Sequence, residues 1–255
     1  MLYETDVRDL PVEAGQARFA GQMPDQPRHS LYLPGKMAFD WLVALVLLVL
    51  LCPLILVLAA IVKLTSTGPA FYCQTRLGLF GRPYLMYKLR TMVANSEEQT
   101  GPTWSTPNDS RVTAVGRVLR DLHLDELPQL WNVLRGEMSL IGPRPERPEL
   151  VPRIEAAIPR YRDRLMVRPG ITGLAQMHLP PDTNLEGVRH KLLFDLYYVR
   201  EVSLSLDLRI GLSTGFHLLG TSLETVGKML VKSCKVEVER DMASTRSQGR
   251  RIEAT

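Results

Sequence analysis

Two adjacent carboxylates, Asp125 and Glu126, are the residues of this sequence whose types and spacing most directly suggest chemistry. Pro128 follows them, and a proline is tolerated in the first turn of a helix because its missing N–H has no intrahelical partner there. We therefore expect a helix that begins near Asp125 and runs to Leu134, with both carboxylates where unpaired N–H groups favour negative charge. The pair fits two roles: a nucleophile beside a ligand for Mg²⁺, or an N-cap aspartate with a glutamate that the helix dipole stabilises.

A basic cluster is expected on a β-hairpin upstream of the pair. Residues 70–74 and 84–89 are β-prone and are separated by a turn that contains glycine and proline. Side chains two apart on a strand share a face, so Lys88 and Arg90 project together, and Arg76 can approach from the neighbouring strand. Taken alone, such a cluster is typical of a solvated sheet edge that resists aggregation.

Residues 41–62 form an apolar run without a single charge. As a straight helix this run would be about 33 Å long, close to the thickness of the hydrocarbon layer of a membrane. Pro53 in its middle frees a backbone carbonyl and kinks the helix. The simplest interpretation is a kinked anchor that spans the membrane once. Basic residues flank the run on both sides, with Lys36 before it and Lys63 after it, and both flanks favour the cytoplasmic side.

Further helices are expected downstream of a polar, proline-rich loop at residues 95–110. Apolar residues repeat at helical spacing over 112–122, and Asn108 or Asp109 can cap that helix. The other expected elements are one or two helices over 149–165, a turn over 168–173, and helices over 190–200 and 206–219. The last two helices carry apolar stripes, which either pack on a core or lie in a membrane interface.

Composition narrows the class of protein. The 255 residues suffice for one sizeable core with room for a membrane element and tails. A net charge of +4 and a pI near 9.0 suit anionic partners such as lipid head groups and phosphates. The three cysteines show neither a metal-binding spacing nor a disulfide framework and fit a reducing compartment. The sequence contains no internal repeat and no nucleic-acid-binding motif.

The stretch from Leu124 to Glu146 (LDELPQLWNVLRGEMSLIGPRPE) resembles the signature of the bacterial sugar transferases, the monotopic polyprenyl-phosphate phosphoglycosyl transferases. The resemblance extends over residues 36–219, and an ordered series of motifs is more specific than any one of them. The further motifs that match are Gln74–Gly78, Lys88–Met92, Asp109–Thr113, Arg168–Gly173 and Asp195–Tyr198.

The resemblance implies a mostly helical α/β fold in four parts. Residues 1–35 would form a flexible arm and 36–67 a membrane-embedded helix, re-entrant and kinked at Pro53. Residues 68–234 would form a small cytoplasmic catalytic domain with a β-hairpin and amphipathic interface helices, and 235–255 a polar tail. A re-entrant helix returns both of its ends to the cytoplasmic face of the bacterial inner membrane, which suits the two basic flanks better than a span does.

The resemblance also implies an enzyme, a phosphoglycosyl transferase of the sugar-1-phosphate class. It would transfer a sugar-1-phosphate from a UDP-sugar to undecaprenyl or another polyprenyl phosphate and release UMP, as the initiating step of exopolysaccharide, envelope polysaccharide or glycoconjugate synthesis. Asp125 would attack the β-phosphorus to give a covalent phospho-sugar intermediate, and Glu126 would bind Mg²⁺. The residues expected to bind substrate or phosphate are Arg76, Lys88, Arg90, Asp109, Arg111, Arg120, Gln129, Arg144 and Arg168.

Two other functions stay open on the sequence. A membrane-anchored scaffold could keep the fold and recruit other polysaccharide enzymes without catalysis, although it would not need the Asp125–Glu126 pair. A glycosyl transferase that moves the sugar without its phosphate would release UDP instead of UMP. The sequence departs from the family pattern at His123 and after Gln176. The second departure leaves the preferred UDP-sugar open, and homo-oligomer formation is open as well.

Overall fold

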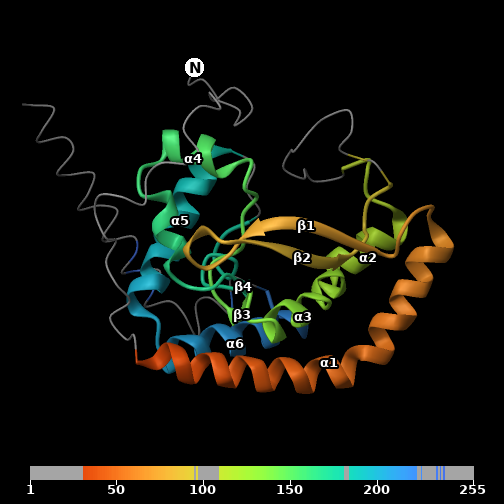
Figure 1. Cartoon of the computed structure of the whole chain (residues 1–255), viewed down its shortest axis with the longest axis horizontal. Helices are drawn as coiled ribbons and strands as arrows, with labels where there is room; N and C mark the ends of the chain where they lie inside the picture. Colours follow the sequence, from red (N-terminus) through yellow and green to blue (C-terminus); the bar gives the residue numbers. More distant parts are fainter. Residues whose placement is uncertain are drawn as a thin grey trace, which may run out of the picture.

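The computed structural model describes residues 31–94, 96, 109–180 and 184–222, together with positions 225, 234, 236 and 238. Most of the expected N-terminal arm, of the polar loop with Asn108 and of the C-terminal tail lies outside the described residues. Figure 1 shows a long bent helix that lies along the other helices and a small β-hairpin. The predicted mostly helical α/β class, with its hairpin, is confirmed.

Helix α1 (Tyr32–Thr65) contains the apolar run and is 34 residues long. By length and composition it could cross a membrane. Pro53 lies within it, and Figure 1 shows the helix bending sharply, as expected where a proline removes a backbone hydrogen bond. Ala44 and Ala59 are buried against the remainder of the fold, whereas Leu50 and Leu56 are exposed. The helix also buries Ile55 and Val62, and it exposes many of its other large apolar residues.

Strands β1 (Phe71–Leu77) and β2 (Pro83–Leu89) form the expected antiparallel hairpin, with the 3₁₀ turn η2 (Leu79–Gly81) between them. Arg76 is paired with Tyr84, and Tyr72 with Lys88. Cross-strand partners share a face, so Arg76 lies on the face of Tyr84. Lys88 follows Tyr84 by an even number of residues on β2 and shares that face, so Arg76 and Lys88 lie on the same side of the hairpin.

Helix α2 (Ala114–Asp121) leads to the carboxylate pair. Its N-cap is Thr113, whose Oγ1 accepts a hydrogen bond from Gly116 N at 2.9 Å. The predicted cap at Asp109 is wrong, because this carboxylate pairs with Arg111 at 2.6 Å. A charge-assisted hydrogen bond is stronger than a neutral one, which explains the preference for Arg111.

The carboxylate pair lies on the 3₁₀ turn η3 (Leu124–Glu126), and helix α3 (Gln129–Leu134) follows it. The prediction of one helix from Asp125 to Leu134 is therefore wrong. Pro128 has no N–H to donate, and the two N–H groups before it bond to carbonyls three residues back, at 3.3 and 3.4 Å. Both carboxylates consequently precede a short helix and do not lie in its first turn.

Two short strands, β3 (Ser139–Ile141) and β4 (Gly170–Thr172), pair in parallel. The sequence predicted only a turn over 168–173. At this crossing the two backbones touch, since a Cβ atom on Gly170 would lie 2.1 Å from Gly142 N. A Cβ atom on Gly142, where the segment that carries Arg144 leaves β3, would lie 2.4 Å from Arg168 O, so glycine is required at both positions.

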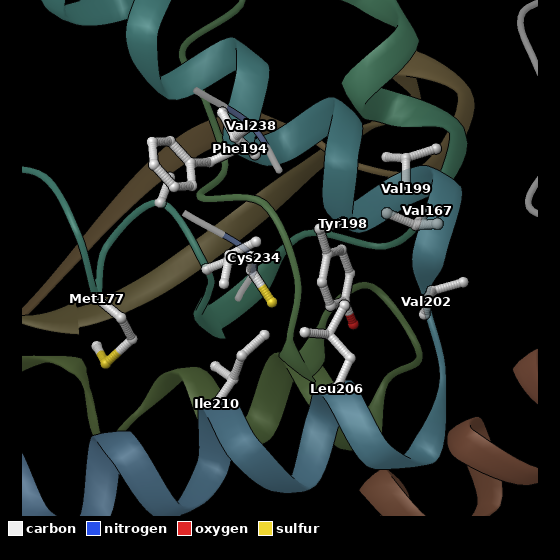
Figure 2. Packing of buried hydrophobic residues seen from close by; sticks show 12 residues of the cluster. Val167, Met177, Phe194, Tyr198, Val199, Val202, Leu206, Ile210, Cys234 and Val238 are labelled. Atoms are coloured by element: carbon white, nitrogen blue, oxygen red, sulfur yellow. The ribbon is translucent and has the colours of Figure 1, made fainter. Parts of the chain in front are cut away.

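The predicted helical stretch over 149–165 consists of α4 (Val151–Ala157) and η4 (Tyr161–Met166), as expected. Helices α5 (Leu185–Glu201) and α6 (Leu204–Leu218) correspond to the last two predicted helices, and α5 begins five residues before its predicted start at 190. Figure 2 shows the core that they build with a later segment of the chain. Its members include Met177, Phe194, Tyr198, Leu206, Ile210, Cys234 and Val238.

A buried ionic network joins the N-terminal part of α1 to α6. Lys36 Nζ lies 2.8 Å from Asp207 Oδ2 and 3.2 Å from Asp40 Oδ2. Tyr32 and Tyr198 donate hydrogen bonds to the two carboxylate oxygens of Asp207, at 2.8 and 2.7 Å. We refer to this group as the α1–α6 network. It fastens α1 to the rest of the fold at one end.

Candidate active site

Glu126 lies between two cations. Lys88 Nζ and an Arg144 guanidinium nitrogen lie 2.7 and 2.8 Å from the same oxygen, Oε1. The residue is 8% exposed, and this burial opposes ionisation, but Arg144 and Lys88 outweigh it and hold the pKa of Glu126 well below its usual range. Among the described residues, no donor reaches the other oxygen, Oε2. One oxygen of an ionised carboxylate therefore remains for a further ligand.

Asp125 is 7% exposed and accepts no hydrogen bond within the described part of the chain. Burial raises the pKa of Asp125 and the charge of Glu126 adds to this rise, whereas Lys88, Arg120 and Arg144 limit it. A carboxylate that is set among cations but is not hydrogen-bonded by them is suited to nucleophilic attack, because no bond has to break first.

Further charges lie beside Asp125. Burial lowers the pKa of Arg120, and the charges of Asp125 and Asp109 oppose that shift. Arg120 Nε donates to Thr91 Oγ1 at 2.8 Å, and Arg111 pairs with Asp109. The structure thus brings three of the predicted phosphate-binding residues to Asp125: Lys88, Arg120 and Arg144. We call the following five residues the carboxylate cluster: Lys88, Arg120, Asp125, Glu126 and Arg144.

Arg144 is supported by residues that were not predicted as site residues. The buried guanidinium of Arg164 donates to the backbone carbonyl of Arg144 at 2.8 Å and pairs with Asp195 at 2.7 Å. A further bond joins Arg164 to Tyr161 Oη at 3.0 Å. Asp195 begins one of the motifs noted above, but its partner is 31 residues away in sequence. No local pattern indicates this pairing.

The other basic residues of the hairpin region have different partners. Arg76 donates to the carbonyl of Pro145 at 3.2 Å and pairs with Glu146 at 3.4 Å, so it supports the segment that carries Arg144. Arg90 is buried and donates to the backbone carbonyls of Ser66 and Thr67, just after α1. The prediction that Lys88 and Arg90 project together is wrong, because Arg90 lies beyond the last residue of β2 and binds the end of α1.

Gln129 and Arg168 complete the predicted set. Gln129 opens α3 and is 2% exposed, and its Nε2 has no hydrogen-bond partner among the residues described. Arg168 is half-buried and contacts the carbonyl of Gly136 at 2.8 Å and the sulfur of Met37 in α1. Neither partner belongs to the carboxylate cluster. The substrate-binding roles of both residues stay predictions.

A magnesium ion is compatible with this geometry. No group of three or more His, Cys, Asp or Glu side chains in the described ranges is placed to hold a metal. Magnesium, however, often takes only one or two carboxylates and completes its shell with water and substrate phosphate oxygens. Glu126 fits that requirement because both of its cationic partners bind Oε1 and leave Oε2.

Known proteins resemble this chain over most of its length. The family model of the bacterial sugar transferase matches residues 31–221. A UDP-N-acetylgalactosamine-undecaprenyl-phosphate N-acetylgalactosaminephosphotransferase of Aeromonas hydrophila is 44% identical over 179 residues, which cover 70% of this chain and 42% of that protein. A UDP-glucose:undecaprenyl-phosphate glucose-1-phosphate transferase of Caulobacter vibrioides is 45% identical over 188 residues, covering 73% and 70%.

An exopolysaccharide production protein of Rhizobium leguminosarum is 39% identical over 180 residues, covering 69% of this chain and 90% of that protein. The chain thus spans most of the Rhizobium protein but less than half of the Aeromonas relative. The family model itself includes α1, the hairpin, the carboxylate cluster and α6. This chain belongs to the bacterial sugar transferase family.

Proposed function

We propose that this protein is a phosphoglycosyl transferase that moves a sugar-1-phosphate from a UDP-sugar to undecaprenyl or another polyprenyl phosphate and releases UMP. The observation that carries the proposal is Asp125, a nearly buried carboxylate that accepts no hydrogen bond from the described residues and lies among Lys88, Arg120 and Arg144. The names of the Aeromonas and Caulobacter relatives, which describe transfer of a sugar phosphate to undecaprenyl phosphate, support the same reaction.

In the first step, a carboxylate oxygen of Asp125 attacks the β-phosphorus of the UDP-sugar. A bond forms between that oxygen and the phosphorus, the bond from the phosphorus to the bridging oxygen breaks, and UMP leaves with the electron pair. Lys88, Arg120 and Arg144 offset the negative charge of the diphosphate and of the departing UMP. The product on the protein is a phospho-sugar ester of Asp125.

In the second step, a phosphate oxygen of the polyprenyl phosphate attacks the same phosphorus. The new bond completes a polyprenyl diphosphate-sugar, and the bond to Asp125 breaks and restores the carboxylate. Because the reaction has two steps, one site can bind the water-soluble UDP-sugar first and the membrane-bound polyprenyl phosphate afterwards. The covalent intermediate holds the sugar phosphate between these two encounters.

We assign Mg²⁺ binding to Glu126, with Asp125 beside it. When bound there, the ion supplies positive charge to the phosphate oxygens of the substrate. Without substrate, Lys88 and Arg144 compensate the charge of Glu126. Both cations bind Oε1, so Oε2 is the oxygen that would hold the ion.

We place the protein at the cytoplasmic face of the inner membrane, with α1 re-entrant. The outward side of α1 is apolar, and α6, which runs beside α1 in Figure 1, carries an exposed apolar row at four-residue spacing. Exposed rows of this kind suit the lipid interface. The basic flanks of α1 favour the cytoplasm at both ends. The residues of the α6 row are Leu204, Leu208, Leu212 and Phe216.

The deciding experiment follows the nucleotide product. Membranes that contain the full chain are incubated with undecaprenyl phosphate, Mg²⁺ and each of several UDP-sugars, and the released nucleotide is identified by chromatography. We expect UMP, released in equal amount to the lipid-linked diphosphate sugar. Release of UDP would identify a glycosyl transferase, and the absence of both nucleotides with every donor would favour a scaffold.

A further inference from the structure

A small open hollow adjoins the carboxylate cluster and shares Arg144 with it. Three other parts of the fold contribute to its walls: η4, the loop after β4, and α5. The mechanism above uses no residue of these three parts. The polar residues that line it are Arg144, Glu146, Arg164, Gln176, Lys191 and Asp195.

One of these residues has an unsatisfied acceptor. Gln176 Nε2 donates to the carbonyl of Ile171 at 3.1 Å, which fixes the orientation of the amide. Gln176 Oε1 is buried and has no partner among the described residues. Buried acceptors without a hydrogen bond are uncommon in native proteins and call for an explanation. A hydroxyl group of a ligand would supply the missing donor.

Several of the charged groups that line the hollow belong to ion pairs. Arg164 and Asp195 neutralise each other at 2.7 Å, and Glu146 is paired with Arg76. The walls hold three cations, Arg144, Arg164 and Lys191, and two carboxylates, Glu146 and Asp195, so they combine hydrogen-bond donors with acceptors. A surface of paired charges that offers both donors and acceptors suits a neutral group with many hydroxyls.

A sugar fits the hollow better than a uracil ring does. Tyr161 is the aromatic residue of its wall, and the guanidinium of Arg164 lies over the Tyr161 ring, 5.1 Å from its centroid. One face of that ring is therefore covered and cannot stack on a base. Arg144 connects the hollow to Glu126, beside the proposed nucleophile. The sugar of the donor is joined through one oxygen to the phosphorus under attack, so it must occupy space next to Asp125.

We propose that this hollow binds the sugar of the donor, and that Gln176 and Lys191 determine which sugar is accepted. The inference rests on the proposed function. Gln176 Oε1 accepts a hydrogen bond from a sugar hydroxyl or amide, and Lys191 donates to an oxygen on the same ring. Donors that differ in the orientation or acetylation of these groups are discriminated here.

The test compares donors with the sugar-free product. For the full chain in lipid nanodiscs, kcat/KM is measured by UMP release with UDP-glucose, UDP-galactose and their two N-acetylated counterparts. Binding of UMP is measured by calorimetry, which needs no turnover. In Gln176→Leu we expect kcat/KM for the preferred donor to fall at least about tenfold, the ratio between donors to shrink at least about fivefold, and UMP affinity to stay within about twofold. Gln176→Glu keeps an acceptor and retains more of the preference.

Lys191→Met is a second variant, at a partly exposed position on α5. We expect it to change the ratio of kcat/KM between donors at least about threefold. Arg189→Met is the matched control, because Arg189 is exposed on the same helix and does not line the hollow. Equal losses for all donors, together with weaker UMP binding, would place the nucleotide in the hollow and overturn the proposal. Unchanged donor ratios in both variants would also overturn it. A wild-type protein that releases no UMP would instead refute the proposed function.

Discussion

The α1–α6 network and the carboxylate cluster both bury acidic groups beside a lysine, but they differ in how fully those groups are bonded. In the network, Asp207 receives bonds on both oxygens from Tyr32, Tyr198 and Lys36. In the cluster, two cations crowd one oxygen of Glu126, and Asp125 receives no hydrogen bond from the described residues. A saturated buried charge holds elements together, whereas an unsaturated one remains available to a substrate.

The largest effect on activity is expected at Asp125. Asp125→Asn keeps the shape of the side chain but removes the negative charge that attacks phosphorus, so UMP release should fall at least about 10³-fold. No labelled phospho-sugar should be trapped on the variant. Thermal unfolding should be little changed, because Asp125 holds no hydrogen bond that supports the described fold. Turnover near the wild-type rate would disprove the nucleophile role.

The largest effect on stability is expected in the network. Lys36→Met leaves Asp40 and Asp207 buried without their cation, which should cost about 3–5 kcal/mol of unfolding free energy. Denaturation in detergent, followed by circular dichroism, would measure this loss. Lys63→Met is the control, since Lys63 is exposed at the other end of α1 and should change stability by less than about 0.5 kcal/mol. Equal losses in the two variants would show that the network has no special role.

Glu126→Gln should reduce activity by about 100-fold and alter its dependence on Mg²⁺ concentration. The amide keeps an oxygen for Lys88 but is a poor ligand for a hard cation. Initial rates measured over a series of Mg²⁺ concentrations would report both changes. Glu155→Gln is the matched control, because Glu155 lies on α4 and pairs with Arg162 of η4, and neither residue belongs to the carboxylate cluster. An unchanged Mg²⁺ profile in Glu126→Gln would argue against the ligand role.

A smaller loss, about tenfold in kcat/KM, is expected for Arg164→Lys. A lysine can still pair with Asp195 but cannot also hold the Arg144 carbonyl through a guanidinium fork. If Arg164 acts by positioning Arg144, Arg164→Lys and Arg144→Lys together should lose less than the product of their separate effects. Additive losses in this double-mutant cycle would show that the two arginines act independently.

The smallest effect is expected for Arg168→Ala, with less than about a threefold loss of kcat/KM, because its partners are Gly136 and Met37. The UMP-release assay checks this directly. A loss as large as that of Arg144→Ala would support the phosphate-binding role that the family resemblance implies for Arg168.

Local chemistry made part of this structure predictable. The hairpin followed from β-prone runs around a glycine-containing turn, and the bend in α1 followed from Pro53 in an apolar run. The position of Asp125 and Glu126 next to Lys88 was expected only through the family resemblance. Pro128 was correctly interpreted as a helix-start signal, but its missing N–H favoured a 3₁₀ turn where a longer helix was expected.

Pairings between distant polar residues were not predictable. Lys36 and Asp207 are far apart in sequence, and Arg164 and Asp195 lie on different elements, so neither pair produces a periodic pattern. The same is true of β3 and β4, whose three-residue lengths are too short for alternation to be recognised. These pairings depend on which elements meet in the folded chain. The Arg164–Asp195 pair supports Arg144, and the Lys36–Asp207 pair holds α1 against α6.

The contact between the backbones at Gly142 and Gly170 couples two halves of the protein mechanically. No side chain separates the two backbones at this contact, so a movement of β4 must also move the main chain that leads to Arg144. The loop with Gln176 begins just after β4. If that loop adjusts around the proposed sugar, we expect the movement to pass through this backbone contact to Arg144, whose guanidinium binds Glu126.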